Sequence, residues 1–169
     1  MMVTKKRKIA EEGREGAIRA AVSILAYKEN TERELFEKLV DRGCTREDAR
    51  EAVRFAVGKN YLCESRYFAR FAENCAQSRL YGRQRILMEA RRKGFSEKTL
   101  SEADAVLDDI DFCEVCYKAL KKCSLPTAEK ATASLLRRGF ALGEIKAALA
   151  KFREESGSAF GAVKETIED

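Results

Sequence analysis

The chain has 169 residues, of which 45% are hydrophobic and 36% charged, and its formal net charge is +5. It contains no histidine, which excludes the Ser-His and Cys-His pairs of nucleophilic catalysis. Its longest apolar runs are four residues, far short of the ~20 that a membrane-spanning helix needs. We therefore expect a protein that is not an enzyme, does not enter a membrane, and carries no cofactor or metal.

The first expected element is a basic arm over residues 1–15, which contains Lys5, Lys6, Arg7 and Lys8 and is expected to be disordered. Acidic residues follow these basic ones within the arm, so the arm lacks the apolar core of a secretory signal. Six cysteines without an export signal indicate reduced thiols. We therefore expect a cytoplasmic protein.

Residues 16–60 have the pattern of three short helices. Apolar residues recur at helical spacing in the first of them, at Ile18, Ala21, Val22 and Leu25. Thr31 and Glu34 form a capping-box pattern, in which each side chain satisfies a free backbone N–H. Gly43 is expected to end the second helix, because glycine enters the left-handed conformation without steric cost. Thr45 is positioned to cap the third helix.

The same pattern returns twice along the chain. Gly94 and Gly139 each follow a basic residue, and they stand 51 and 45 residues after the preceding glycine of this kind. Ser96 is expected to cap one helix that continues through Leu107. Pro126 suits the first turn of the helix that ends at Gly139. The sequence therefore predicts an internal repeat.

This repeat predicts an all-α fold of three tandem three-helix repeats, over residues 16–60, 61–109 and 110–153. An acidic C-terminal tail is expected over residues 154–169. Each repeat is too small to bury a good core alone, so the copies are expected to stack into an elongated, curved monomer.

Basic residues concentrate around the second helices of the last two repeats. Nine Lys or Arg accompany three acids over residues 59–93, whereas seven acids accompany one base over residues 95–115. Because corresponding helices of stacked repeats share a face, we expect a basic strip suited to a phosphate backbone or an acidic protein groove. For any single arginine, a solvated surface with i,i+4 ion pairs is the favoured interpretation. The expected contact residues are Arg79, Arg83, Arg85, Arg91, Arg92, Lys93, Lys121, Lys122, Lys130, Arg137 and Arg138.

Two clusters could carry other chemistry. Cys113 and Cys116 form a C-x-x-C pair with only Cys123 nearby, so packing of the pair in the core is favoured over a zinc or redox site. An acidic cluster is expected to cap a helix near residue 112 or to face solvent rather than hold a cation. It consists of Asp108, Asp109 and Asp111.

Other functional classes remain open at this point. Three-helix units resemble helix-turn-helix domains, so direct binding to single- or double-stranded DNA is the main alternative. The expected third helix of the second repeat is acidic, which argues against a recognition helix there. A scaffold without any DNA involvement and a thiol-based redox sensor are further alternatives.

Segments of all three repeats also resemble one known family. They are residues 31–35 (TEREL) with Arg42 and Gly43, residues 60–69 (NYLCESRYFA) with Lys93 and Gly94, and residues 119–122 (ALKK) with 135–140 (LLRRGF). In this order, over roughly residues 20 to 152, they resemble the RecX family of bacterial modulators of the RecA recombinase.

The resemblance implies tandem three-helix repeats and binding along the groove of the RecA–single-stranded-DNA filament. Such binding would limit filament growth and dampen strand exchange, ATP hydrolysis and stimulated repressor cleavage, in homologous recombination, DNA repair and the SOS response. The chain departs from the family at Ala90, where leucine is common, and at Cys63, which replaces the first member of an acidic pair. Glu64 stands at the second position of that pair, where it is expected either to cap a helix or to meet RecA.

Overall fold

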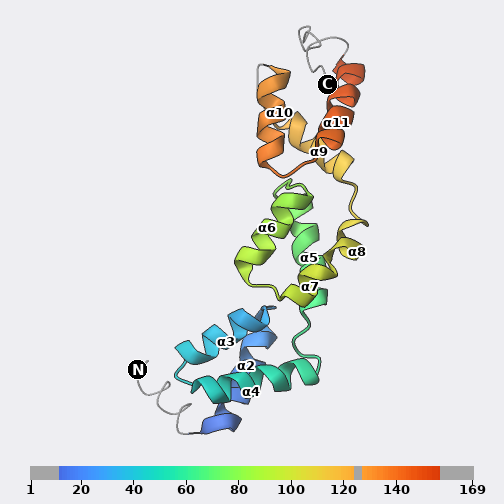
Figure 1. The fold of residues 1–169 in the computed structure, drawn as a ribbon. Helices are drawn as coiled ribbons and strands as arrows, with labels where there is room; N and C mark the ends of the chain where they lie inside the picture. Colours follow the sequence, from blue (N-terminus) through green and yellow to red (C-terminus); the bar gives the residue numbers. More distant parts are fainter. Residues whose placement is uncertain (1–11, 124–126, 157–169) are drawn as a thin grey trace. The chain divides into compact units, whose positions relative to one another are not determined.

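The computed structural model of the chain describes residues 12–123 and 127–156. All regular structure within these residues is helical, in ten helices without a strand (Figure 1). The predicted all-α class is therefore confirmed. Lys5, Lys6, Arg7 and Lys8, together with Pro126 and residues 157–169 of the expected tail, lie outside the described residues. None of the helices in the described part has both the length and the apolar character needed to cross a membrane.

The described chain divides into two compact units. The first contains residues 12–70 and 90–103, and the second contains residues 71–89 and the described residues from 104 onward. The boundary passes through helices α5 (Glu64–Gln77) and α6 (Arg83–Lys93), and again after the first residue of α8.

The first unit is a bundle built on α2 (Gly13–Tyr27), α3 (Glu32–Asp41) and α4 (Arg46–Gly58). Helix α2 packs mainly on α4, through alanines that let the two backbones approach closely. The start of α5 and helix α7 (Glu97–Ser101) complete the unit. Its fully buried side chains include Ala17, Ala21, Leu35, Leu39, Ala49, Ala52 and Ala56.

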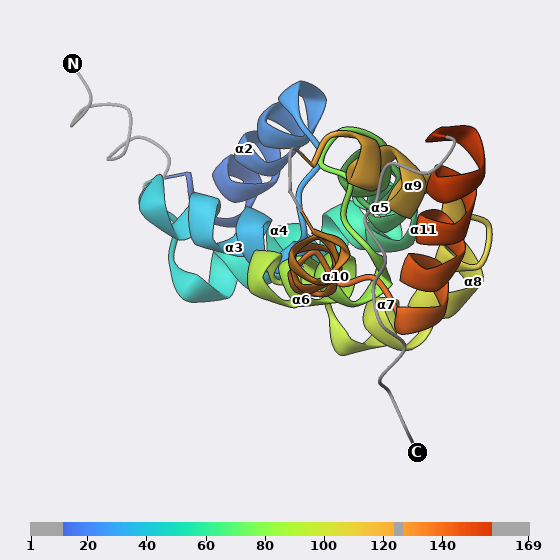
Figure 2. The ribbon, with the colours of Figure 1, turned by 90° about the horizontal axis from the view of Figure 1, so that it is seen from above.

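The second unit contains the later part of α5, the first part of α6, and four further helices. These are α8 (Ala103–Leu107), α9 (Phe112–Lys121), α10 (Ala128–Arg137) and α11 (Leu142–Ser156). Helix α11 lies alongside α9 in both Figure 1 and Figure 2. Leu120, Leu135, Phe140 and Ile145 fill the space among these helices and are buried.

The predicted helix starts are confirmed. The Thr31 hydroxyl accepts a hydrogen bond from Glu34 N, and the Glu34 carboxylate accepts one from Thr31 N, both at 3.0 Å. Thr45 caps α4 by accepting from Asp48 N at 3.1 Å, and Ser96 caps α7.

The predicted helix stops are confirmed as well. Gly43, Gly94 and Gly139 have φ values of 95°, 90° and 86°, the left-handed conformation that a side chain disfavours.

Several sequence expectations need correction. Helix α2 begins at Gly13, inside the expected arm, and α11 continues to Ser156, inside the expected tail. The expected single helix after Ser96 is broken into α7 and α8. The Ser101 hydroxyl donates to the Lys98 carbonyl at 2.7 Å, and the backbone N–H of Glu102 donates to the same carbonyl at a long 3.3 Å. Such side-chain competition weakens a helix.

Candidate functional site

Four of the predicted contact residues line one hollow in the second unit. The hollow has a volume of about 550 Å³, and its residues come from the turn before α6, from α6 itself and from the end of α10. We call it the arginine hollow. Its lining residues are Arg79, Tyr81, Arg85, Ser134, Arg137 and Arg138.

A strained turn positions one wall of the arginine hollow. Leu80 has φ 54° although it is not glycine, and its side chain is buried. A left-handed conformation costs such a residue about 1–2 kcal/mol. The next residue, Tyr81, donates its N–H to the Cys75 carbonyl at 3.1 Å. The turn therefore anchors Leu80 in the interior, with Arg79 and Tyr81 of the hollow on either side of it in sequence.

The opposite wall is fixed by backbone contact between the start of α6 and the end of α10. Gly82 N donates to the Arg138 carbonyl at 2.8 Å, and Gln84 N donates to the Gly139 carbonyl at 3.2 Å. Free N–H groups at a helix start thus meet free carbonyls at a helix end, which also aligns the two helix dipoles favourably. This contact brings arginines about 50 residues apart in sequence into one lining.

Arg85 is a half-buried cation of the hollow. Its guanidinium pairs with Glu89 at 2.8 Å and lies over the Tyr81 ring, 5.5 Å from the centroid. Its Nε atom is buried and meets no hydrogen-bond acceptor among the described residues. A buried donor without an acceptor costs about 1–3 kcal/mol.

The other arginines of the hollow have little compensation from acids of the chain. Arg138 donates to the backbone carbonyl of Arg79 at 3.4 Å, which leaves its charge unneutralised. Arg79 and Arg137 are exposed, and neither forms an ion pair with an acid in the described part of the chain. Positive charge therefore converges here, and the arrangement favours an anionic partner.

Arg83 lies outside this hollow. Its guanidinium pairs with Asp104 at 2.9 Å and also with Asp108, and it lies 5.7 Å from the centroid of the Phe112 ring. The hydrogen bond with Asp108 raises the pKa of Arg83 above its ordinary value. Arg83 thus connects the start of α6 to α8 within the second unit, and its charge is neutralised there.

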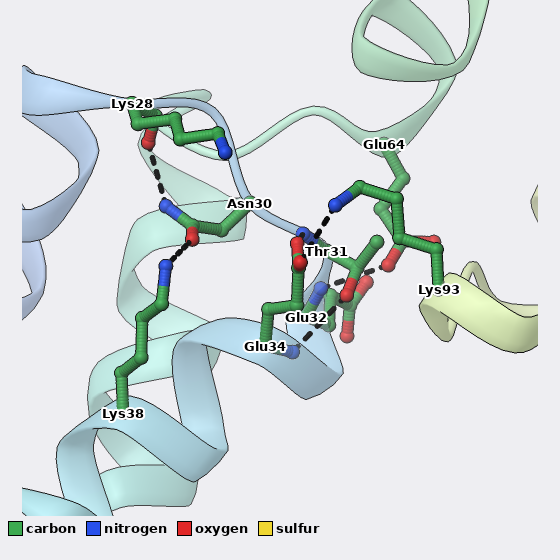
Figure 3. A network of polar contacts seen from close by, with 8 residues as sticks. All are labelled: Lys28, Asn30, Thr31, Glu32, Glu34, Lys38, Glu64 and Lys93. Atoms are coloured by element: carbon green, nitrogen blue, oxygen red, sulfur yellow. Dashed lines mark hydrogen bonds and ion pairs between the residues drawn. The ribbon is translucent and has the colours of Figure 1, made fainter. Parts of the chain in front are cut away.

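Lys93 is also engaged within the chain (Figure 3). Its Nζ donates to the Glu34 carboxylate at 2.7 Å and lies 5.5 Å from the Tyr67 ring centroid. Burial acts to lower the pKa of Lys93, but the contacts with Glu34 and Tyr67 outweigh it and raise this pKa. The lysine therefore stabilises the start of α3 within the first unit.

The remaining predicted contacts lie on exposed helix surfaces and do not line the hollow. Lys121 lies over the Tyr117 ring at 5.0 Å. The others, all exposed, are Arg91, Arg92, Lys122 and Lys130.

Glu64 caps helices within the chain, which was one of its two expected roles. Its carboxylate is buried and accepts from Glu32 N at 2.8 Å (Figure 3). The same carboxylate accepts from Ser96 N at 2.9 Å, from the Ser96 hydroxyl at 2.6 Å and from the Thr99 hydroxyl at 3.1 Å. One acid therefore serves the starts of both α3 and α7.

The cysteine pair is not packed as predicted. Cys116 is buried, but Cys113 is exposed, because α9 turns only one side of this region toward the core. Burial raises the pKa of Cys116 to about 12. Asp111 caps α9 by accepting from Glu114 N at 3.0 Å. The described residues contain no cluster of acids and cysteines arranged for a metal.

Two features were missed by the sequence analysis. Glu144 accepts from Ala141 N at 2.7 Å and supports the start of α11; an acid three residues after the helix entry is the available signal. A second group of arginines lies on α3 and α4, and it includes Arg46 and Arg50. Their i,i+4 spacing on α4 was the available signal.

Comparison with known proteins finds relatives that carry the same name. The regulatory protein RecX of Shigella dysenteriae serotype 1 is 32% identical over 143 residues, which cover 75% of this chain and 85% of the relative. RecX of Escherichia coli K12 gives the same identity and coverage. RecX of Vibrio campbellii is 27% identical over 146 residues, covering 80% of this chain and 90% of the relative.

The fold has a solved counterpart as well. The crystal structure of RecX from Lactobacillus salivarius matches with a TM-score of 0.73 at 17% identity, covering 83% of this chain and 97% of that one. No family model matches the chain.

Proposed function

The chain belongs to the RecX family of regulatory proteins, and we propose that it regulates the RecA recombinase by binding the RecA–single-stranded-DNA filament. The bound protein limits filament growth and lowers the recombinase, ATPase and coprotease activities of RecA. It acts as a cytoplasmic monomer and has no enzymatic activity of its own.

The arginine hollow is the observation that carries this proposal. Its cations are held by a strained turn and a helix-to-helix backbone contact, while the acids among the described residues leave most of their charge uncompensated. A filament of protein on DNA offers carboxylates and phosphates, the two groups that guanidinium forks bind bidentately.

The proposal includes the division into three-helix repeats over residues 16–60, 61–109 and 110–153. It also assigns supporting contacts to the exposed bases outside the hollow. These are Arg91, Arg92, Lys121, Lys122 and Lys130.

Direct DNA binding through a helix-turn-helix unit is less well supported. In the middle of the chain, the position of a recognition helix is taken by α7 and α8, which have only five residues each. Their acids, including Asp104 and Asp108, would also repel phosphates. This alternative predicts tight, salt-sensitive DNA binding without RecA.

The test is DNA-dependent ATP hydrolysis by RecA, measured while the protein is titrated in. We expect the unaltered chain to inhibit hydrolysis and the double variant Arg79→Glu/Arg137→Glu to require at least about tenfold more protein for the same effect. Arg42→Glu is the control, because it reverses an exposed arginine of the first unit that forms no ion pair with an acid in the described part of the chain. No inhibition by the unaltered chain at severalfold excess refutes the function. Equal inhibition by the double variant would instead show that the contact with the filament does not lie in the arginine hollow.

A further inference from the structure

A second basic hollow lies in the first unit, between α3 and α4, and none of its residues belongs to the contacts predicted from sequence. It has a volume of about 460 Å³. Its floor includes the half-buried ring of Phe36 and the buried side chain of Val53, and arginines surround this floor. We call it the α3/α4 hollow.

Two of the arginines are neutralised and two are not. Arg33 pairs with Glu37 at 2.9 Å, and Arg54 pairs with a carboxylate of α4 at 3.3 Å. Arg46 and Arg50 form no ion pair with any acid in the described ranges. The available charge of the hollow therefore resides on these two residues.

Arg46 and Arg50 converge on one aromatic ring. Their guanidinium carbons lie 5.7 and 5.8 Å from the centroid of Phe36. They occupy successive turns of α4, a rise of about 6 Å. A cation–π contact at an exposed site contributes about 0.5–1 kcal/mol, which orients a guanidinium but leaves its N–H groups available to an anion.

The lining therefore combines a two-arginine anion site with an apolar, aromatic floor, and Glu32 stands at its edge. We propose that the α3/α4 hollow binds a nucleotide unit, with the phosphate on Arg46 and Arg50 and the base against Phe36 and Val53. Bases stack on aromatic rings and on guanidinium planes. The unit comes either from a free nucleotide or from a single strand, since both present the same chemistry.

Glu32 distinguishes this ligand from an acidic peptide. Its backbone N–H is used by Glu64, while its exposed carboxylate lines the hollow. A carboxylate accepts hydrogen bonds from the amino groups of adenine, cytosine or guanine, whereas the ionised side chains of a peptide rich in Asp and Glu have no donor to offer it.

The test uses the full chain without RecA, so its outcome is independent of the proposed function. Binding of a short labelled oligodeoxyadenylate is followed by fluorescence anisotropy, and binding of AMP by calorimetry. We expect Arg46→Gln/Arg50→Gln to weaken binding at least about tenfold. Phe36→Leu keeps an apolar floor without a ring, and we expect a loss of about fivefold or more because base–aromatic stacking is absent. Arg42→Gln, an exposed arginine outside the hollow, is the matched control.

Thermal melting of each variant checks that the fold is retained. Binding of both AMP and the oligonucleotide indicates a site for one nucleotide, and binding of the oligonucleotide alone indicates a site for a strand; either result supports the proposal when the variants lose affinity. Absence of binding by the unaltered chain overturns it. Competition by poly-glutamate at equal charge, together with unaltered binding by Phe36→Leu, overturns it as well, since any anion would then suffice.

Discussion

Gly82 lies directly against Gly139, at the contact that creates the arginine hollow. A Cβ placed on Gly82 would stand 2.3 Å from the Gly139 carbonyl oxygen and 2.5 Å from the Phe140 nitrogen. Both are backbone atoms, which no side-chain rotation can move away. The approach of α6 to α10 therefore depends on the absence of a side chain at residue 82.

Gly82→Ala is expected to destabilise the fold by about 1–3 kcal/mol, the usual range for overpacking a tight contact. Urea unfolding followed by circular dichroism measures the change. Gly58→Ala is the matched control, because a Cβ there meets nothing within 4 Å. Alanine is preferred over glycine in a helix by about 0.5–1 kcal/mol, so this control is expected to be neutral or stabilising. Equal stability of the two variants would show that α6 and α10 do not approach as described.

Glu64→Gln is expected to destabilise the fold by about 2–3 kcal/mol, because an amide replaces a charged acceptor that serves several donors. Its NH₂ group would also face the N–H of either Glu32 or Ser96. Urea unfolding again provides the measurement. Glu73→Gln, at an exposed position on the same helix, is expected to change stability by less than about 0.5 kcal/mol. A similar effect of both substitutions would contradict the capping role of Glu64.

The ion pair between Glu34 and Lys93 is expected to stabilise the fold only within a window of pH. Burial acts to raise the pKa of Glu34, yet its hydrogen bonds bring this pKa below the ordinary 4.5, and the pKa of Lys93 rises above 10.5. A lowered carboxyl pKa stabilises the fold above 4.5, and this contribution is lost as the pH falls through the folded value. A raised ammonium pKa stabilises below 10.5, and this contribution is lost as the pH rises through the folded value.

Lys93→Gln should therefore reduce the free energy of unfolding by about 1 kcal/mol between these limits. The difference from the unaltered chain should shrink toward both acid and alkaline pH. Urea unfolding at a series of pH values measures it. A difference that stays constant over the whole range would mean that the lysine contributes through packing rather than charge.

The cysteines of α9 should differ in reactivity. At pH 8 the Cys116 thiol remains protonated, because burial raises its pKa to about 12, whereas Cys113 is exposed to reagent. Iodoacetamide should alkylate Cys113 in the native protein and Cys116 only after unfolding, as read by peptide mass spectrometry. The variant Cys113→Ser should lose the alkylation that α9 shows in the native protein. Formation of a disulfide between the two under mild oxidation would restore the redox-sensor alternative.

Local signals in the sequence predicted the helix ends well. Thr31, Thr45 and Ser96 cap helices as expected, and Gly43 and Gly139 end them. A cap or a left-handed stop depends on a few neighbouring residues, so sequence spacing contains the necessary information.

Features that depend on tertiary contacts could not be predicted from local sequence in the same way. At the break between α7 and α8, the Ser101 hydroxyl competes with the backbone for a carbonyl. Arg83 was expected to belong to the basic strip, but it pairs with Asp104 and Asp108 and does not line the arginine hollow. Charge counted along a chain does not reveal which acid folds back onto which base.

The buried carboxylate of Glu64 has a consequence for dissecting this protein into fragments. Backbone groups at residues 32 and 96 are bound to one side chain that lies midway between them in the sequence. A truncation placed anywhere between α5 and α7 would remove the three donors at Ser96 and Thr99 and leave this carboxylate with the Glu32 N–H alone. An N-terminal fragment meant to fold independently should therefore extend past Thr99.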